Sequence, residues 1–411
     1  MNDLEALAAF PAQVPLAYRV AARAVLGHLS RWKAGALALS LPNGTVCTLG
    51  DPSASRRIDV VVRDWRFFWR ALTAGDIGVG EAYMAGEWTC DDLVGLCRMF
   101  LRDQAMLKHR SAWTVPARLG HAALRRLRAN TLSGSRRNIT YHYDLSNDLY
   151  RLFLDESMMY SCAVFGRDDM SLAEAQQHKI DEICRRLGLA PGMDVLEIGG
   201  GWGAFAVHAA RQYGCRVTSL TLSDRQRQLA RERVAAAGVE SRVDIQLCDY
   251  RRVAGQFDRI VSIEMFEAVG YEYYGAFFGT CSGVLRPEGK MFLQTIYMPD
   301  QHFDTYRRDF DWLRKHIFPG SLLASVYEIT RALKQHTALR IESMQEIGLH
   351  YARTLRLWRE RFMSRLPEVR QLGFDDRFIR MWEFYLASCE AAFAARYIGD
   401  VQMILARPSI G

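Results

Sequence analysis

Short apolar runs alternate with amphipathic stretches through the second half of the chain. The runs are rich in Val, Ile and Leu, and the stretches between them place apolar residues at helical spacing. Strands that alternate with helices predict an α/β domain with a doubly wound parallel sheet, which binds ligands at the carboxyl ends of its strands. The predicted strands are residues 195–198, 216–223, 243–249, 257–263 and 289–296, with helices at 204–210 and 225–237.

The pattern in the first hundred residues is different. Helical stretches alternate with short β-prone runs, and Gly and Pro mark the turns between them. Residues 1–103 are therefore predicted to form a small α+β module that packs against or binds another surface, without catalytic side chains of its own. The expected elements are a helical stretch over 4–34, a hairpin around Pro42-Asn43-Gly44, a strand at 58–62, a helix at 65–72, a glycine-rich turn region at 75–88 and a helix that ends near Phe100.

Length and charge distribution divide the chain further. With 411 residues the chain is longer than one ordinary domain. Residues 104–143 contain Lys and Arg but no Asp or Glu, and the pattern over 115–128 is that of a basic amphipathic helix. Such a helix is typical of contact with an anionic membrane surface, and a solvated linker helix fits the same pattern. We therefore expect a basic linker at 104–137, between a lipid-binding module and a domain over 138–411.

Composition narrows the class of protein. Hydrophobic residues make up 49% of the chain, and no window approaches the ~18 consecutive apolar residues of a membrane-spanning helix. The acidic amino terminus does not resemble a secretory signal, and nine cysteines without a C-x-x-C pair argue against disulfides and a metal site. Basic and aromatic residues are not interleaved as in RNA-binding segments. We expect a cytoplasmic protein that binds neither metal nor nucleic acid.

A glycine-rich turn follows the first predicted strand of the α/β domain. Gly199, Gly201 and Gly203 are followed at once by a helix, so the backbone can approach a ligand at a helix N-terminus. The G-x-G-x-G spacing differs from the G-x-G-x-x-G of dinucleotide-binding proteins, which argues against NAD. At later strand ends, an acid can accept from the amine of adenine and a tyrosine can stack on its ring. S-adenosylmethionine is therefore the predicted ligand, held by the turn and by Glu197, Thr221, Gln226, Asp249 and Tyr250.

Further motifs stand in order along residues 138–408. They are Tyr160-Ser161-Cys162-Ala163, the turn 197–203 with Trp202, Leu220-Thr221-Leu222-Ser223, Asp258-Arg259-Ile260-Val261-Ser262, Met265-Phe266-Glu267-Ala268-Val269-Gly270, Ile317-Phe318-Pro319-Gly320 with Ser325, and residues 348–355. Together they resemble the cyclopropane-fatty-acyl-phospholipid synthase family, and a looser likeness extends over residues 78–88. Several separated motifs in the right order make the resemblance specific.

The resemblance implies an S-adenosylmethionine-dependent methyltransferase acting on a cis double bond of an unsaturated phospholipid acyl chain. Methyl transfer leaves a carbocation, and loss of a proton from the new methyl group, with bound bicarbonate as the base, closes a cyclopropane ring. The resemblance also implies a Rossmann-like class I methyltransferase domain with helical insertions over the substrate, a homodimer, and a peripheral position on the inner face of the membrane. Carried over residue by residue, Tyr160 and Ser161 join the cofactor contacts, and the catalytic set is Cys162, Glu267, Gln294, the main chain of Ile296, and Tyr351.

Three positions depart from the commonest bacterial pattern of this family. Gln294 stands where many members have His, and an amide cannot carry a proton; Glu264 and Ala268 stand where Gly and His are common. The combination resembles a subgroup that includes plant-type cyclopropane synthases, and also relatives that methylate the lipid without closing a ring. A methyltransferase that adds a methyl or methylene branch to a carbon of the acyl group is therefore an alternative. A small-molecule N-methyltransferase and a non-catalytic lipid-binding protein are two others.

Overall fold

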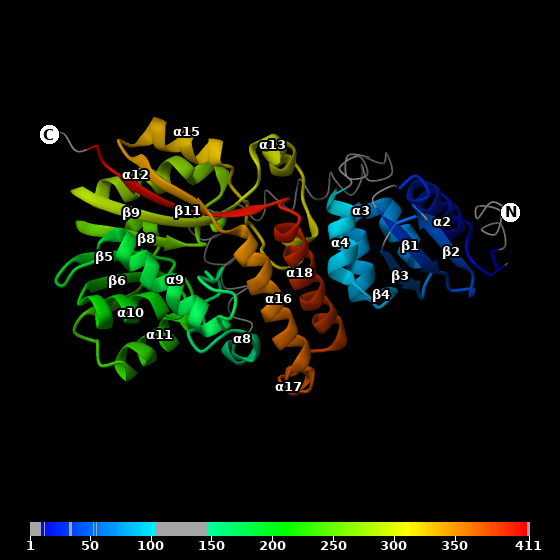
Figure 1. Ribbon diagram of the computed structural model, residues 1–411, viewed down its shortest axis with the longest axis horizontal. Coiled ribbons are helices and arrows are strands. Elements are labelled where there is room, and N and C mark those ends of the chain that lie inside the picture. Colours follow the sequence, from blue (N-terminus) through cyan, green and yellow to red (C-terminus); the bar gives the residue numbers. More distant parts are fainter. Residues whose placement is uncertain are drawn as a thin grey trace. The chain divides into compact units, whose positions relative to one another are not determined.

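A seven-stranded sheet forms the centre of the larger of two compact units of the chain (Figure 1). The computed structural model describes residues 10–11, 13–32, 35–51, 53–54, 56–102 and 146–408. The strand order is β10-β11-β9-β8-β5-β6-β7, in which β5 to β9 pair in parallel and β11 and β10 add an antiparallel edge. The strands are β5 (Asp194–Ile198), β6 (Arg216–Thr221), β7 (Val243–Leu247), β8 (Phe257–Ile263), β9 (Leu285–Tyr297), β10 (Arg340–Glu346) and β11 (Gly399–Ala406).

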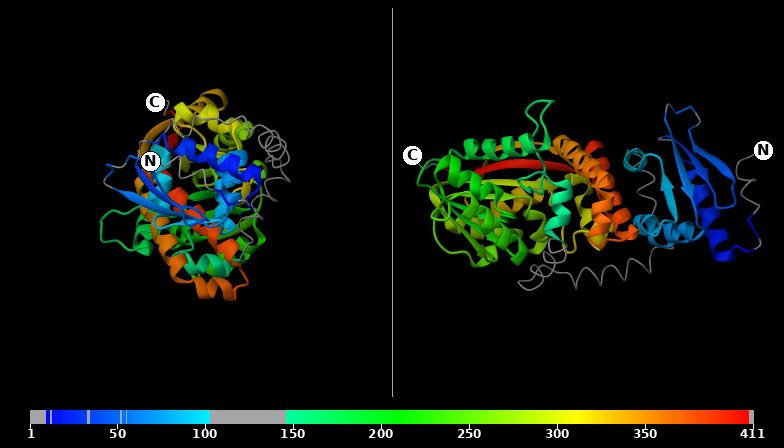
Figure 2. Two further views of the ribbon diagram at one scale, coloured as in Figure 1. Left: turned by 90° about the vertical axis from the view of Figure 1, so that its right-hand side faces the viewer. Right: turned by 90° about the horizontal axis from the view of Figure 1, so that it is seen from below.

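Helices cover both faces of this sheet, as the alternating pattern predicts. One core lies between the sheet and α9, α10 and α11, and a second core lies between the sheet and α12 and α15 (Figure 1). The right-hand view of Figure 2 shows α9 running alongside β11, drawn in red. The helices of this unit are α8 (Asn147–Phe153), α9 (Leu172–Leu187), α10 (Ala204–Tyr213), α11 (Asp224–Ala236), α12 (Tyr274–Val284), α13 (Asp300–Arg308), α15 (Val326–His336) and α16 (Gly348–Ser364), with short 3₁₀ turns η2 (Tyr250–Arg252), η3 (Phe266–Ala268) and η4 (Tyr271–Tyr273).

The N-terminal module is built on a four-stranded sheet of order β2-β1-β3-β4. Strands β1 and β2 form the predicted antiparallel hairpin, while β3 pairs in parallel with β1 and antiparallel with β4. Apolar side chains of these strands and of the helices share one core, which includes Trp32, Phe68 and Trp88. The elements are α2 (Leu16–Leu29), β1 (Ala36–Ser40), β2 (Val46–Gly50), β3 (Arg57–Val62), α3 (Arg66–Met84), β4 (Trp88–Cys90) and α4 (Leu93–Arg102).

The glycine-rich stretch that follows residue 72 is helical, whereas the sequence predicts a turn region there. Helix α3 continues to Met84 across a kink at Gly75, whose φ is 59°. Glycines in the second half of α3 allow close packing: a Cβ on Gly78 would lie 2.0 Å from the Arg70 carbonyl oxygen, and one on Gly80 would lie 2.5 Å from the Trp312 ring. Glycine in a short stretch of sequence usually indicates a turn. In α3, however, glycine is required because neighbouring atoms leave no room for a side chain.

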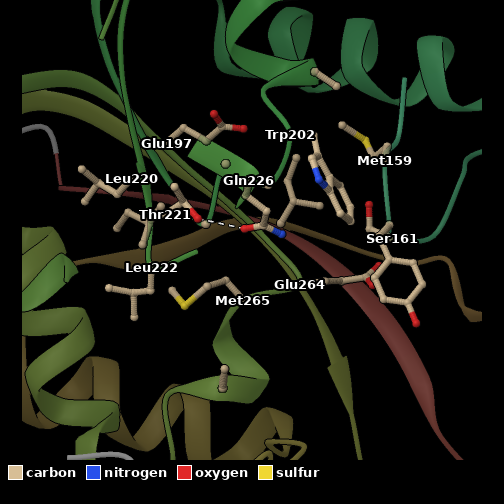
Figure 3. A pocket seen from close by; sticks show the side chains of 18 of the residues that line it. Met159, Ser161, Glu197, Trp202, Leu220, Thr221, Leu222, Gln226, Glu264 and Met265 are labelled. Carbon is tan, nitrogen blue, oxygen red and sulfur yellow. Dashed lines mark hydrogen bonds between the residues drawn. The ribbon is translucent and has the colours of Figure 1, made fainter. Parts of the chain in front are cut away.

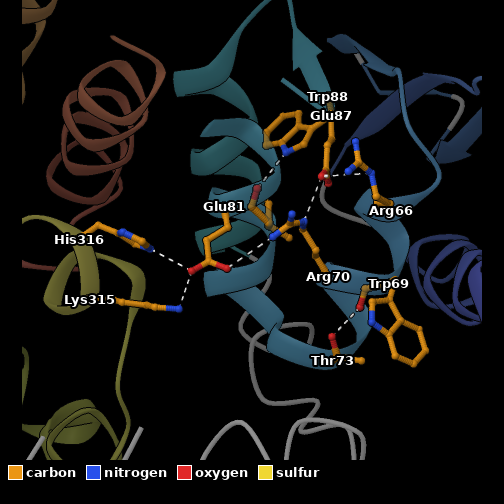
Figure 4. Close-up of polar contacts among 10 residues, drawn as sticks. Arg66, Trp69, Arg70, Thr73, Glu81, Glu87, Trp88, Lys315 and His316 are labelled. Carbon is orange, nitrogen blue, oxygen red and sulfur yellow. Dashed lines mark hydrogen bonds and ion pairs between the residues drawn. The ribbon is translucent and has the colours of Figure 1, made fainter. Parts of the chain in front are cut away.

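A network of polar side chains ties α3 to residues 309–317 (Figure 4). The Glu81 carboxylate accepts hydrogen bonds from Lys315 Nζ at 2.5 Å and from His316 Nε2 at 3.1 Å. The hydrogen bond from His316 is the main cause that lowers the pKa of Glu81 to about 2. Residues 309–317 and 363–395 belong to the same compact unit as the N-terminal module, and the boundaries at 103 and 138 stay predictions. They contain α14 (Trp312–His316), α17 (Leu366–Gln371) and α18 (Asp376–Ala394).

The basic linker predicted at 104–137 lies outside the described residues. Within the residues that the structure does describe, no helix is both long and apolar enough to cross a membrane.

Candidate active site

The glycine-rich turn joins β5 to α10 and lies against β6. The main-chain N–H groups of Gly199 and Gly200 both donate to the carbonyl oxygen of Leu220, at 3.0 and 2.9 Å. Gly199, Gly201 and Gly203 have φ values of 87°, 53° and 85°, which side-chain-bearing residues rarely adopt. A Cβ on Gly199 would also lie 2.7 Å from the Cγ atom of Met265. The turn therefore requires glycine for both backbone and steric reasons.

Glu197 stands near the carboxyl end of β5, on the pocket that Figure 3 shows. Its Oε2 accepts a hydrogen bond from Ser219 Oγ at 2.6 Å, and the side chain is buried. Burial raises the pKa of Glu197 to about 7, because the buried carboxylate loses its hydration. Beside it, Thr221 Oγ1 donates to Gln226 Oε1 at 2.8 Å. These three polar side chains line one pocket with the glycine turn.

Most of the predicted cofactor residues line this pocket, and two do not. Asp249 is not in the lining, and its carboxylate is paired with Arg251 at 2.6 Å. Gly203 is the N-cap residue of α10 and is not in the lining. Tyr250 lines the pocket, with its ring packed edge-on against Phe277 at 5.2 Å. The other predicted residues in the lining are Tyr160, Ser161, Glu197, Gly199, Gly201, Thr221 and Gln226.

Glu264 is the residue on which the predicted catalytic groups converge. It follows the last residue of β8, has a φ of 48°, and also lines the pocket. Its Oε1 accepts from the Cys162 main-chain N–H at 2.8 Å and from Gln294 Nε2 at 2.7 Å. Its Oε2 accepts from the Tyr351 hydroxyl at 2.6 Å. Three residues expected to surround bicarbonate thus surround a carboxylate of the protein itself.

Glu267 and Ile296 form a separate pair beside this centre. The Ile296 main-chain N–H donates to Glu267 Oε1, which also accepts from Thr295 Oγ1 at 2.9 Å. Burial, and then the charge of Glu264, raise the pKa of Glu267 to about 8, so this side chain holds a proton at neutral pH. Bicarbonate does not fit the predicted ligand set in this structure, because each of these donors already serves a glutamate.

Two further buried ionisable residues contact the same centre. Lys179 of α9 is fully buried and donates from Nζ to Ser161 Oγ at 2.6 Å. Burial lowers the pKa of Lys179 to about 8, against the opposing charge of Glu264. Asp400 of β11 accepts from Gln294 Nε2 at 3.0 Å, and burial followed by the charges of Glu264 and Glu267 holds its pKa well above the usual range.

Glu264, Lys179 and Asp400 are not among the site residues predicted from the sequence, although each carries a signal. Lys179 interrupts the apolar face of α9, and Asp400 interrupts a strand whose residues are all buried. Buried charges are rare unless they are paired, so both interruptions indicate a partner elsewhere in the protein. The only signal for Glu264 in the sequence is that Gly is common at this position in the family that the chain resembles.

The arrangement suits chemistry through a cation. Tyr160, Tyr351 and Trp358 pack their rings together, with centroids 5.2 Å apart for Tyr160–Trp358 and 6.2 Å apart for Tyr351–Trp358. Aromatic faces and a carboxylate stabilise a positive charge without adding to it covalently. The Cys162 thiol is no competing nucleophile, because burial holds its pKa well above the usual range.

Comparison with known proteins identifies the family. The model of the mycolic acid cyclopropane synthetase family matches residues 131–403. The chain is 42% identical over 409 residues to the tuberculostearic acid methyltransferase UfaA1 of Mycobacterium tuberculosis, a match that covers 96% of this chain and 93% of that relative. It is 38% identical over 361 residues to a cyclopropane-fatty-acyl-phospholipid synthase of Escherichia coli, a match that covers 86% of this chain and 89% of the relative.

A solved structure agrees with this result. The mycolic acid cyclopropane synthase CmaA1, crystallised with SAH and CTAB, is 33% identical and superimposes with a TM-score of 0.62 over 66% of this chain and 98% of its own. The predicted Rossmann-like methyltransferase fold and the predicted methyl donor, S-adenosylmethionine, are confirmed. The chain belongs to the family of mycolic acid cyclopropane synthetases and cyclopropane-fatty-acyl-phospholipid synthases, the S-adenosylmethionine-dependent methyltransferases of lipids.

Proposed function

We propose that this enzyme adds one carbon from S-adenosylmethionine to the cis double bond of an unsaturated phospholipid acyl chain, forming a cyclopropane ring. The observation that carries the proposal is the position of Glu264, which lines the cofactor pocket and receives hydrogen bonds from Cys162, Gln294 and Tyr351. A half-buried carboxylate that accepts from a tyrosine hydroxyl suits a reaction whose intermediate is a carbocation.

One set of residues would bind the cofactor, and another set would stabilise the carbocation. The glycine turn, Glu197, and the Thr221–Gln226 pair would hold the cofactor, which supplies an electrophilic methyl group to the alkene. The rings of Tyr160, Tyr351 and Trp358 would stabilise the resulting cation and exclude water, which would otherwise add to it. Bicarbonate, the expected base, has no place in this scheme because its expected ligands are already engaged.

A second product is favoured by a specific observation. The relative that matches 96% of the chain is named for tuberculostearic acid, whereas the relative named for cyclopropane formation on phospholipids matches 86%. Gln294, in place of the His that is common in the family, is a further difference at the site. A methyl- or methylene-branched acyl group is therefore the second candidate product, formed by the same methyl transfer.

The substrate implies contact with a membrane surface. We propose that the enzyme acts as a peripheral protein on the inner face of the membrane, where the basic segment 104–137 meets anionic headgroups. This segment lies outside the described residues, so the support is its charge pattern alone. A homodimer remains an expectation from the family resemblance.

Purified enzyme, S-adenosylmethionine and vesicles of a cis-monounsaturated phospholipid test the proposal. Mass spectrometry should show acyl groups heavier by one CH₂, while a matched saturated phospholipid should gain nothing. Proton NMR then separates cyclopropane methylene resonances from the olefinic resonances of an exo-methylene branch. A mass gain confined to the headgroup, or no gain at all, would contradict chemistry on the acyl group.

A further inference from the structure

We propose that Glu264 is the built-in base of this enzyme and replaces the bound bicarbonate expected from the family resemblance. This inference rests on the proposed function, because the base is needed only when a carbocation must lose a proton. It concerns a side chain that the sequence marks only as a departure from the family pattern. Four observations support it.

The first observation is that Glu264 occupies the anion site, the place where the family resemblance puts bicarbonate, beside Cys162 and Tyr351. A bicarbonate and a glutamate carboxylate both present two oxygens in one plane, and the Glu264 oxygens already accept from the Cys162 N–H, the Gln294 amide and the Tyr351 hydroxyl. A second anion at this position would lose these donors to Glu264 and would face its negative charge. The built-in carboxylate and bicarbonate therefore exclude one another.

The second observation is the backbone at Glu264, with a φ of 48°. The left-handed conformation is unfavourable for a side-chain-bearing residue, and such residues concentrate at functional sites, where the surroundings enforce them. The Glu264 main-chain N–H donates to the Gln294 carbonyl oxygen at 2.8 Å, which holds this conformation against β9. It turns the side chain towards Cys162 and Tyr351, at the edge of the cofactor pocket.

The third observation explains why an amide stands at position 294. The Gln294 Nε2 group donates one hydrogen bond to Glu264 and one to Asp400, at 2.7 and 3.0 Å, while its Oε1 accepts from Gln402 Nε2 at 3.1 Å. One amide nitrogen thus serves two carboxyl groups, which a histidine nitrogen with a single proton cannot do. Gln294 and Glu264 therefore form a matched pair, and the amide positions the carboxylate without transferring a proton.

The fourth observation is the charge balance around the carboxylate. Lys179 is a buried cation, while Asp400 and Glu267 are the buried acids that face the same centre. Burial raises the pKa of Glu264, and the charge of Lys179 together with hydrogen bonds from Tyr351 and Cys162 opposes that rise. Burial raises the pKa of Glu267 to about 8 and that of Asp400 well above its usual range, whereas the charge of Lys179 favours the ionised form of Glu264.

The proposed step transfers one carbon to the alkene and releases one proton. One alkene carbon bonds to the methyl carbon as the carbon–sulfur bond breaks, and the other alkene carbon becomes the cation. A C–H bond of the new methyl group then breaks, its electron pair closes the ring by forming the second C–C bond, and Glu264 takes the proton. The protonated Glu264 passes this proton to solvent before the next turnover. An exo-methylene product needs the same loss of one methyl proton, so Glu264 serves both candidate products.

The test compares the wild-type enzyme with E264Q and E264G in buffer stripped of carbon dioxide and in the same buffer with added bicarbonate. Wild-type activity should be independent of bicarbonate. E264Q keeps the volume of the side chain without the charge, so kcat should fall about 10²- to 10⁴-fold, the usual contribution of a general base, and bicarbonate should not restore it. E264G suits the positive φ and opens the anion site, so it should be slow alone and accelerated by bicarbonate.

A second measurement works without turnover. Carbon-13 NMR of labelled bicarbonate should show line broadening with E264G and none with the wild type, and SAH titration should show that both variants keep the cofactor site. Loss of wild-type activity in stripped buffer, or broadening with the wild type, would overturn the proposal. The wild type could bind no bicarbonate and also methylate no acyl group. That result would contradict the proposed function but would agree with Glu264 occupying the anion site.

Discussion

Replacing Glu197 tests the energetics of the cofactor pocket, because burying its carboxylate lowers the free energy of unfolding. The pKa of Glu197 is raised from 4.5 to about 7, chiefly by burial. The folded protein therefore binds this proton more tightly than the unfolded protein does. Below pH 4.5 both states hold the proton and the group costs nothing. The cost grows as the pH rises and is complete above about pH 7.

The size of this cost follows from the two pKa values. The difference between 4.5 and about 7 corresponds to about 3 kcal/mol at 1.36 kcal/mol per pKa unit. Replacing Glu197 by Gln removes the charge but keeps an oxygen that can accept from Ser219 Oγ. We therefore expect E197Q to be more stable than the wild type by up to about 3 kcal/mol at about pH 8.5, and by about 1 kcal/mol near pH 5.5.

The same substitution should weaken cofactor binding. If the ionised carboxylate accepts hydrogen bonds from the cofactor, E197Q should bind SAH about ten- to a hundredfold more weakly, the usual worth of a hydrogen bond to a charged group. Urea unfolding of the ligand-free protein measures the stability, and calorimetric titration measures the affinity. E240Q, at an exposed carboxylate, is the matched control and should change neither. An E197Q protein less stable than the wild type at the higher pH would refute the reasoning.

Three further substitutions test the site. Y351F removes the hydroxyl that donates to Glu264 Oε2 at 2.6 Å, so kcat should fall about ten- to a hundredfold with unchanged SAH affinity. K179M removes the buried cation that lowers the pKa of Glu264, so the pH optimum of kcat should move upward. G199A places a Cβ 2.7 Å from Met265 at a φ of 87°, so SAH titration should show loss of binding.

Each of these variants has a matched control. Y327F and K334M change exposed side chains of the same types and should leave kcat and its pH optimum unchanged. G201A has a positive φ but meets nothing within 4 Å, so it should impair SAH binding less than G199A does. Equal losses in G199A and G201A would show that backbone conformation alone, and not contact with Met265, controls the turn.

The five parallel strands β5 to β9 are predictable because their signals are local, whereas the antiparallel edge of β11 and β10 was not predicted. Each of the five contains a short apolar run, and amphipathic helices stand between them. The glycine turn is recognisable for the same reason, since strand, turn and helix follow one another directly from Asp194 to Tyr213. The same local reading fails in α3, where Gly78 and Gly80 indicate a turn but serve close packing within a helix.

The side chain of Asp249 shows what a strand end leaves open, and its contact with the cofactor stays a prediction. Asp249 follows β7, where the sequence predicts a contact with the cofactor, yet its carboxylate is engaged by Arg251 two residues later. Tyr250, its neighbour, does line the pocket. A strand end predicts the edge of the sheet at which a residue lies, but the rotamer and the competing partner decide where its side chain points.

The sequence by itself determined the order of the strands from β5 to β9, the glycine turn and the family resemblance, because each depends on neighbouring residues or on motifs in order. Only the tertiary structure decided what lies at the anion site. Glu264 meets Cys162 across 102 positions and Tyr351 across 87, and Gln294 meets Asp400 across 106. No local pattern encodes contacts between residues so far apart in the sequence, because the pairing of β8, β9 and β11 brings these residues together.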